Sequence, residues 1–401
     1  MSFDLIPKKR LGLYVHIPFC LSKCAYCDFN SAVPENDEFM GRYVSAVITH
    51  MNNYRDAAGE YEVDTVFIGG GTPTALPKAE LIRLIKAIKK TFNLTRYAEF
   101  TVEANPATVT LPLLKQLRRI GVNRLSFGMQ SANNRELKAL SRRHTRQEFI
   151  ESYRLARRAG FDNINVDVMF GIPYQTFDSL MKTLDFVTRL SPEHISMYNL
   201  KIEPGTPFYK NLKAVREVCA DEDTEYAMYT EAIEFLERRG YPQYEISNFA
   251  RHGFPCIHNL KYWNCDEYLG FGVSAHSYFN GNRFSFISDV RKYMEAFENI
   301  ETDITLTDEF DTLESRERMG EYIMLRMRLV DGLDPRAFAA KFGVSFEETY
   351  GEKLKKYLQG GFMVRYNNGC YALTPGGMFV SNYILSDILE FDDLGSYSGN
   401  F

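Results

Sequence analysis

The segment Leu13–Cys27 reads Leu-Tyr-Val-His-Ile-Pro-Phe-Cys-Leu-Ser-Lys-Cys-Ala-Tyr-Cys, a strand-like run followed by three cysteines within eight residues. Cys20, Cys24 and Cys27 lie in the loop expected directly after that strand. Three thiolates can hold three corners of a [4Fe–4S] cube, which is ordinarily bound by four cysteines. The fourth iron would then lack a protein ligand and accept a small molecule, as the open position of a catalytic metal site does.

Zinc is the main alternative for these cysteines. Zinc ligands usually come as two pairs at regular spacing, whereas the other cysteines, Cys219, Cys256, Cys265 and Cys370, are scattered singly. Cys256 and His258 could still complete a distant site. A disulfide framework is disfavoured in a chain of 401 residues with seven cysteines and no secretory signal. The spacing therefore favours a cluster and leaves zinc open.

The composition is that of a globular protein, with 45% hydrophobic and 25% charged residues. The length allows one large domain and a smaller one. The 47 basic and 52 acidic residues give a net charge of -5, which disfavours a general attraction to nucleic acid or to anionic membranes. No stretch approaches 18 apolar residues, so we expect no membrane span, and any membrane contact would be transient. Free thiols without an export signal predict a cytoplasmic protein.

Short β-rich runs alternate with amphipathic helical patterns from residue 11 to about 199. Such alternation predicts a parallel sheet, because parallel neighbours need crossover helices. Six units are too few for a closed eight-stranded barrel, so we expect an α/β fold with a partial (β/α)6 TIM-like barrel. The predicted strands are Leu11–Ile17, Val63–Ile68, Glu99–Val102, Arg124–Phe127, Asn163–Val168 and His194–Tyr198. The predicted helices are Ala79–Phe92, Leu111–Ile120, Arg146–Ala159 and Phe177–Leu190, and a further helix is expected at Asp221–Arg239.

The pattern changes after a charged stretch near residues 301–317. Three short helical patterns precede the dipeptide Asn368-Gly369, which is a strong hairpin signal between two apolar runs. These helices are expected at Glu317–Arg328, Pro335–Phe342 and Ser345–Gln359. We therefore expect a partial barrel with its extension over residues 1–290, a small winged-helix-like α+β domain over 300–385, and a tail over 386–401. Without a concentrated basic recognition helix, that domain is expected to have a structural or substrate-covering role.

Glycines and polar residues follow several of the predicted strands. Ligands of parallel α/β sheets bind at the carboxyl ends of the strands, where the loops converge. Gly69–Thr74 reads Gly-Gly-Gly-Thr-Pro-Thr. Three glycines allow the backbone to approach a ligand closely, and the alternative is that they only form a tight turn between a strand and a helix. Glu103 could accept hydrogen bonds from an ammonium or a ribose, and Gln130 could both donate and accept. Asp167 alone would more often be a cap or an ion-pair partner. Together these residues predict a ligand site at one edge of the sheet.

The chain resembles the branch of the radical S-adenosyl-L-methionine (SAM) superfamily that is related to oxygen-independent coproporphyrinogen III oxidase. The resemblance covers nearly the whole chain. It rests on the motifs at Tyr14–Cys20, Gly69–Thr74, Val102–Pro106, Ser126–Ser131 and Asp167–Pro173. In that family three cysteines hold a [4Fe–4S] cluster, and the amino and carboxylate groups of SAM chelate its open iron.

The resemblance implies a role for individual residues but no catalytic residue. The metal ligands would be Cys20, Cys24 and Cys27. Contacts to the cluster-bound SAM would come from Tyr14, Gly70 and Glu103. A second SAM lies alongside in the oxidase, and the matching residues here are Tyr26, Gly71, Thr72, Gln130, Arg142 and Asp167. Whether a second SAM is retained stays open.

Two departures from the oxidase pattern favour another branch. The oxidase has a fourth cysteine two residues after the third, whereas Asp28 and Phe29 follow Cys27 here. The oxidase also has an amino-terminal extension, and the first predicted strand here begins near residue 11. Both features match the haem chaperone (HemW-type) relatives, which bind haem and are implicated in delivering it to respiratory enzymes. The resemblance thus implies a scaffold capable of SAM cleavage but not a coproporphyrinogen dehydrogenase.

The motif His258-Asn-Leu-Lys-Tyr-Trp263 matches the H-N-x-x-Y-W pattern of that chaperone group. Imidazole is a common axial haem ligand, which makes His258 a candidate and His276 a weaker one. The alternative is that His258 and Asn259 brace the barrel as a hydrogen-bonded turn, with Trp263 in the core. The implied partners are haem, haem-receiving respiratory proteins and an electron donor, with no nucleic acid. The alternative functions are the oxidase itself and radical SAM modification of RNA.

Overall fold

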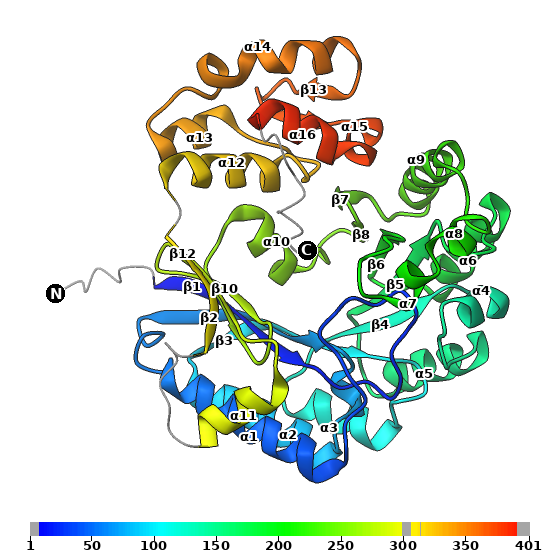
Figure 1. Ribbon diagram of the computed structural model, residues 1–401, viewed down its shortest axis with the longest axis vertical. Helices are drawn as coiled ribbons and strands as arrows, with labels where there is room; N and C mark the ends of the chain where they lie inside the picture. The colour runs from blue at the N-terminus through cyan, green and yellow to red at the C-terminus, as the bar shows by residue number, and fades with distance from the viewer. Residues whose placement is uncertain (1–7, 299–305, 313, 391–401) are drawn as a thin grey trace.

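The computed structural model describes residues 8–298, 306–312 and 314–390. Six parallel strands, adjacent in chain order, form the centre of one large sheet that curves as a partial barrel (Figure 1). They are β1 (Lys9–Ile17), β2 (Tyr61–Gly70), β3 (Leu94–Ala104), β4 (Arg124–Gln130), β5 (Ile164–Phe170) and β6 (His194–Asn199). Each overlaps its predicted strand, so the predicted α/β partial barrel is confirmed.

Helices cover the outer face of this sheet, as crossover connections require. The predicted apolar positions of α2, among them Leu81, Leu84 and Ile88, are fully buried. The helices are α1 (Asp37–Asn53), α2 (Lys78–Thr91), α3 (Leu111–Arg119), α4 (Asn134–Ala139), α5 (Arg146–Arg158), α6 (Phe177–Leu190), α7 (Pro207–Lys210), α8 (Leu212–Arg216) and α9 (Glu222–Arg238), with the short 3-10 helix η1 (Pro73–Ala75) after β2. Helix α1 was not predicted; its Met40, Tyr43 and Val47 nevertheless lie in the core.

The sheet is wider than the six strands predicted. Within the part of the chain that the structure describes, it has twelve strands and stays open, with β12 at one edge and β7 at the other. Strand β9 runs parallel to β1, and β7, β8, β10, β11 and β12 add antiparallel pairs. The bounds are β7 (Gln243–Glu245), β8 (Asn248–Ala250), β9 (Tyr268–Phe271), β10 (His276–Phe279), β11 (Asn282–Phe286) and β12 (Thr307–Asp311). Helix α10 (Ile257–Asn264) lies on the concave side of the sheet, and α11 (Val290–Glu298) packs on α1 (Figure 1).

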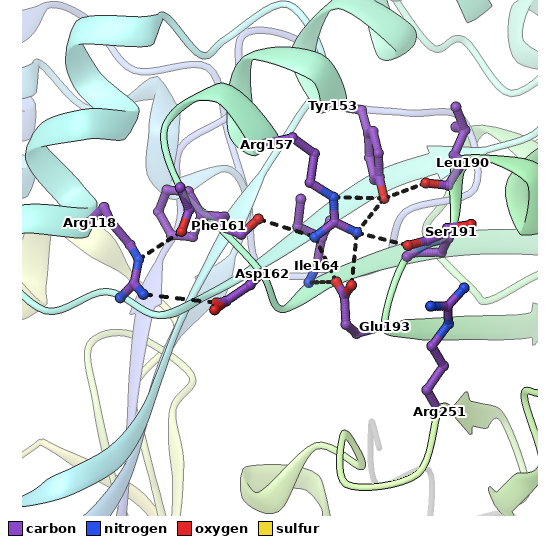
Figure 2. A network of polar contacts seen from close by, with 12 residues as sticks. Arg118, Tyr153, Arg157, Phe161, Asp162, Ile164, Leu190, Ser191, Glu193 and Arg251 are labelled. Carbon is purple, nitrogen blue, oxygen red and sulfur yellow. Dashed lines mark hydrogen bonds and ion pairs between the residues drawn. The ribbon is translucent and has the colours of Figure 1, made fainter.

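An ion-pair network holds the amino ends of β5 and β6 (Figure 2). The guanidinium of Arg157 donates to both carboxylate oxygens of Glu193, at 2.8 and 3.0 Å, and to the hydroxyl of Tyr153 at 2.6 Å. Glu193 also accepts the backbone N–H of Ile164 at 3.0 Å. The network therefore fixes helix α5 to the strands at the end opposite their carboxyl termini.

The carboxyl-terminal unit consists of α12 (Ser315–Arg326), α13 (Pro335–Phe342), α14 (Phe346–Gln359), the hairpin β13 (Met363–Arg365) and β14 (Tyr371–Leu373), α15 (Pro375–Phe379) and α16 (Ser381–Leu389). The predicted helices and hairpin are present. Residue 386, where we expected the tail to begin, lies inside α16, and 391–401 lie outside the described residues. Among the described helices, none has the length and apolar character needed to cross a bilayer.

Candidate cluster and SAM site

The cysteine loop follows β1 and lies against the start of the glycine segment. Backbone N–H groups of Gly71 and Thr72 donate to the carbonyls of Ile17 and Phe19, each at 2.8 Å. Cys20 is buried, with its sulfur 3.6 Å from Thr72 Oγ1, and Cys24 and Cys27 are half-buried. Burial raises the pKa of Cys20, and it raises the pKa of Cys27 to about 11. Without a metal these two thiols therefore stay protonated at neutral pH, and a metal that binds them must displace the protons.

Two glycines are required where the chain passes this loop. Gly70 has φ +107°, and a Cβ there would lie 2.5 Å from the imidazole of His16. A Cβ on Gly71 would lie 2.8 Å from the carbonyl oxygen of Phe19, which is backbone and cannot rotate away. The close approach of β2 to the cysteine loop therefore needs residues without side chains.

Two carboxyl groups, Glu103 at the end of β3 and Asp167 on β5, line the same cavity. Glu103 accepts the backbone N–H of Gly70 at 3.1 Å, and Asp167 accepts from Asn165 at 2.6 Å. Burial, reinforced by the charge of Asp167, raises the pKa of Glu103 to about 8. Burial also raises the pKa of Asp167 to about 6. A cationic ligand group, such as an ammonium, would favour the ionised form of both.

The far wall of the cavity contains polar atoms without partners. Gln130 has φ +68° and follows a register shift between β4 and β5, so the bulge redirects this side chain. Arg142 donates to Gly128 O at 2.5 Å and to Asn105 Oδ1 at 2.7 Å. Gln130 Oε1 and Arg142 Nε are buried and bond to no described protein atom. Since buried polar atoms are nearly always satisfied, these two indicate a ligand position.

The structure brings most of the predicted site residues to one cavity of about 130 Å³. Eleven of the thirteen line it: Cys20, Cys24, Cys27, Tyr26, Gly70, Gly71, Thr72, Glu103, Gln130, Arg142 and Asp167. Tyr14 is half-buried on β1 and bonds to His16 Nδ1 at 3.0 Å, with its pKa raised well above the usual range by burial and by Glu103. Tyr14 and His258 are thus the two predicted residues that do not line this cavity.

His258 takes the bracing role that we gave as the alternative. Its side chain is 1% exposed, and both ring nitrogens are hydrogen-bonded, one to Thr65 Oγ1 and the other to Tyr262 Oη, each at 2.8 Å. Burial lowers its pKa to about 3, and its ring stacks on Phe67. In this structure both nitrogens are engaged, which favours the bracing role over that of an axial haem ligand, and the ligand role stays a prediction. Trp263 is buried in the core, as that alternative expects.

The donor set fits a cubane cluster with SAM. Within residues 8–298, 306–312 and 314–390, no three His, Cys, Asp or Glu side chains are close enough to hold a single metal ion. A cubane does not need such convergence, because its cysteines bind different irons. The unpartnered atoms of Gln130 and Arg142, and the close approach at Gly70 and Gly71, fit a polar organic ligand beside the cysteines.

Sequence reasoning missed several residues that build the site. Asn105, which entered the sequence analysis only within the motif Val102–Pro106, donates to Thr72 Oγ1 at 2.6 Å and accepts from Arg142, so it joins three segments. Glu99 accepts the backbone N–H groups of Ile257 and His258 at 3.0 Å each, and thereby holds α10 inside the barrel. A carboxylate in the middle of a strand, four residues before Glu103, was the available signal, since alternate strand residues share one face.

Comparison with known proteins agrees with this geometry. Residues 14–187 match the family model of the radical SAM superfamily, and residues 313–380 match the model of the HemN C-terminal domain. "Heme chaperone HemW" of Bacillus subtilis (strain 168) is 35% identical over 377 residues, covering 94% of this chain and 98% of the relative. The protein of the same name from Escherichia coli (strain K12) is 32% identical over 384 residues, covering 93% and 97%.

A solved structure shows the same fold. Coproporphyrinogen III oxidase (HemN) from Escherichia coli, described as a radical SAM enzyme, superposes with a TM-score of 0.83. The alignment covers 95% of this chain and 90% of that chain at 24% sequence identity. At that identity the likeness establishes the architecture, a partial barrel with a carboxyl-terminal domain.

Proposed function

The chain belongs to the HemW-type family of radical SAM proteins, and on that premise we propose that it is a haem chaperone. In this proposal it holds a [4Fe–4S] cluster and SAM at the barrel edge, binds haem, and delivers haem to respiratory proteins. The observation that carries it is Phe29, which lines the cavity where the oxidase pattern has a fourth cysteine and is 49% exposed. A phenyl ring there offers an apolar contact and no metal ligand.

The chain's own residues supply binding and orientation. The sulfurs of Cys20, Cys24 and Cys27 would hold the cluster, and Glu103 with the Gly70 backbone would receive the amino end of SAM. When bound, this pair of groups supplies one-electron chemistry. Gln130 and Arg142 provide the unpartnered atoms that a second ligand would engage. Whether that ligand is a second SAM belongs to the same proposal.

The test is an anaerobic haem titration of the reconstituted protein beside a coproporphyrinogen III conversion assay. We expect a saturable Soret band and no conversion under reducing conditions. Robust conversion would refute the chaperone proposal and favour the oxidase. Iron and sulfide analysis of the same sample separates a cluster from a retained zinc ion.

The variant His258→Ala locates the haem ligand. Because both imidazole nitrogens are engaged, we expect this variant to unfold at a lower temperature yet still give the Soret band. Thr65→Val is the matched control, since it removes one hydrogen bond of His258 and leaves the imidazole in place. Loss of haem in His258→Ala with full binding by Thr65→Val would restore the axial-ligand role.

A further inference from the structure

Three segments of the chain form one continuous surface around the cysteines. They are the cysteine loop (residues 20–29), the end of α4 with the loop that follows it (residues 138–143), and α7–α8 with its cap (residues 207–217). The N–H of Ala25 donates to Leu140 O at 3.2 Å, and the N–H of Phe208 donates to Ala25 O at 3.0 Å. Arg143 donates to Leu21 O at 3.2 Å. We call this surface the basic face.

Beneath the basic face lies a small apolar cluster of its own. Leu140 and Phe208 are buried there together with Met169, and Ala25 and Tyr26 of the cysteine loop pack against them. The loop that would hold the cluster is therefore packed against both neighbouring segments. A shared apolar base keeps the three segments in fixed relation, as a docking surface requires.

The charge of the basic face is opposite to that of the whole chain. Six cations on it are exposed: Lys23, Lys138, Arg143, Lys210, Lys213 and Arg216. Only two acids, Asp28 and Glu217, lie in the same segments, which leaves a surplus of four positive charges among the exposed side chains of a chain whose net charge is -5. Within the described residues, none of the six cations forms an ion pair, so their field is not neutralised locally.

Exposed apolar side chains lie among these cations. Leu21, Phe29 and Tyr209 are 52%, 49% and 46% exposed. Lys23 donates to the carbonyl of Phe29 at 3.1 Å, which places a cation beside the exposed ring. A small apolar centre with a charged rim is the composition of a transient protein–protein interface. Opposite charges at such rims raise the association rate more than the affinity.

We propose that the basic face is the docking site for a small acidic protein that donates single electrons, such as a flavodoxin. The proposal rests on the proposed function, because it assumes that Cys20, Cys24 and Cys27 hold a cluster. In the transfer, one electron leaves the donor's cofactor and enters the cluster, and no bond forms or breaks. Cys24 and Cys27 are half-buried at this face, so a partner seated on it comes close to the cluster.

The experiment uses the cluster-loaded protein and a reduced flavodoxin as the probe. The Kd of flavodoxin for the protein is measured by calorimetry at about 0.05 M and about 0.5 M salt. Salt screens the attraction between charges and has little effect on apolar contacts, so the comparison separates the two contributions. The rate of cluster reduction is followed by rapid-freeze EPR, once with flavodoxin and once with dithionite. Dithionite is a small reductant that needs no docking site.

The charge-reversal variant Lys138→Glu/Lys213→Glu tests the face itself, since neither residue lines the cavity. At low salt we expect both the affinity for flavodoxin and the reduction rate to fall by about tenfold or more. Reduction by dithionite should stay unchanged, and the difference should vanish at high salt. Lys86→Glu/Lys182→Glu is the matched control, because these exposed lysines lie on α2 and α6 and the change in net charge is the same.

Equal rates and affinities for the two double variants would overturn the docking proposal. Binding of a single-stranded RNA or of anionic vesicles to the basic face, without binding of flavodoxin, would overturn it as well. In either case, a cluster that dithionite reduces and a haem titration that shows binding would still support the proposed function. Failure of the wild type to assemble a cluster would overturn the proposed function, and this proposal with it.

Discussion

At the scale of single residues, the site holds two acids in surroundings that oppose their ionisation. Glu103 and Asp167 come from different strands, and burial raises the pKa of both, while the charge of Asp167 raises that of Glu103 further. A bound cationic ligand would stabilise the ionised form of both carboxyl groups and so offset the cost of charging them. The unliganded chain therefore keeps a destabilised pair at the position where its ligand is expected, a common property of binding sites.

The variant Glu103→Gln tests this cost through the pH dependence of stability. The pKa of Glu103 is about 8 in the folded chain and near 4.5 in a free side chain. As pH rises from 5 to 8, the unfolded chain loses this proton first, so the free energy of unfolding of the wild type falls. The glutamine cannot lose this proton. Between pH 5 and 8 we therefore expect the free energy of unfolding of metal-free Glu103→Gln, measured by urea denaturation, to fall by about 1–2 kcal/mol less than that of the wild type.

The control for this measurement is Glu231→Gln, which changes an exposed glutamate of α9. It should reproduce the wild-type slope between pH 5 and 8. A Glu103→Gln protein with an unchanged slope would mean that Glu103 is already ionised in the folded chain. Asp167, whose pKa is about 6, should still contribute below that pH in all three proteins.

At the scale of elements, the two ends of the parallel strands have different tasks. The cavity at the carboxyl ends contains polar atoms without hydrogen-bond partners. At the amino ends of β5 and β6, the Arg157–Glu193 network satisfies the polar groups (Figure 2). In barrel proteins, polar groups at the amino-terminal face serve stability. The network is therefore expected to affect unfolding and not ligand binding.

The variants Arg157→Met and Arg118→Met compare how much a partly buried and an exposed ion pair contribute to stability. Arg157 and Glu193 are only 28% and 13% exposed, and Arg157→Met leaves the carboxylate without its bidentate partner. We expect a loss of about 2–4 kcal/mol in the free energy of unfolding. Arg118 pairs with Asp162 at 3.9 Å, with an acid that is 82% exposed, and its substitution should cost about 0.5 kcal/mol. Similar losses in the two variants by urea denaturation would contradict this interpretation.

The elements that the sequence predicted share a physical property. Strands β1 to β6 are apolar runs, and all but the first pair are separated by helices of clear 3.6-residue periodicity, so pattern alone located them. Strands β7 and β8 have three residues each, and β9 pairs with β1 more than 250 residues away in the chain. Their stability comes from the neighbouring strand and not from local sequence, which explains why the widening of the sheet was not predicted.

The site was more predictable than the outer sheet, because its residues lie at strand ends whose convergence follows from topology. His258 shows the limit of that reasoning. A motif states which residues occur together, but only the fold shows that Thr65 and Tyr262 occupy both nitrogens of its ring. The position of Glu99 on the strand was visible in the sequence, but its partners at Cys256, Ile257 and His258 lie more than 150 residues away and only the fold shows them.

At the scale of the whole molecule, the carboxyl-terminal unit meets the barrel in two places. Helix α12 packs on α10, and a second line of contacts runs through β7. Ile246 donates to Arg328 O at 2.9 Å, and Val330 donates to Tyr244 O at 3.0 Å, so β7 continues into the second unit by backbone bonds. Helix α15 packs on α9 beside this line (Figure 1). The hydroxyl of Tyr229 donates to Ile246 O at 2.8 Å and therefore connects the two contacts.

The variant Phe379→Ala tests whether this packing holds the two units together. The ring of Phe379 lies 5.5 Å from that of Tyr226 and 6.0 Å from that of Tyr229, so its removal leaves a gap beside α9. We expect a loss of about 2–3 kcal/mol, less than for a fully buried phenylalanine. Hydrogen exchange at the amides of Ile246 and Val330 should accelerate, because those bonds depend on the docked unit. Tyr383→Ala, which alters a side chain 71% exposed on α16, should leave both amides protected. Unchanged protection in Phe379→Ala would show that the packing of α15 on α9 does not maintain these backbone bonds, and that other contacts, such as that of α12 with α10, hold the unit in place.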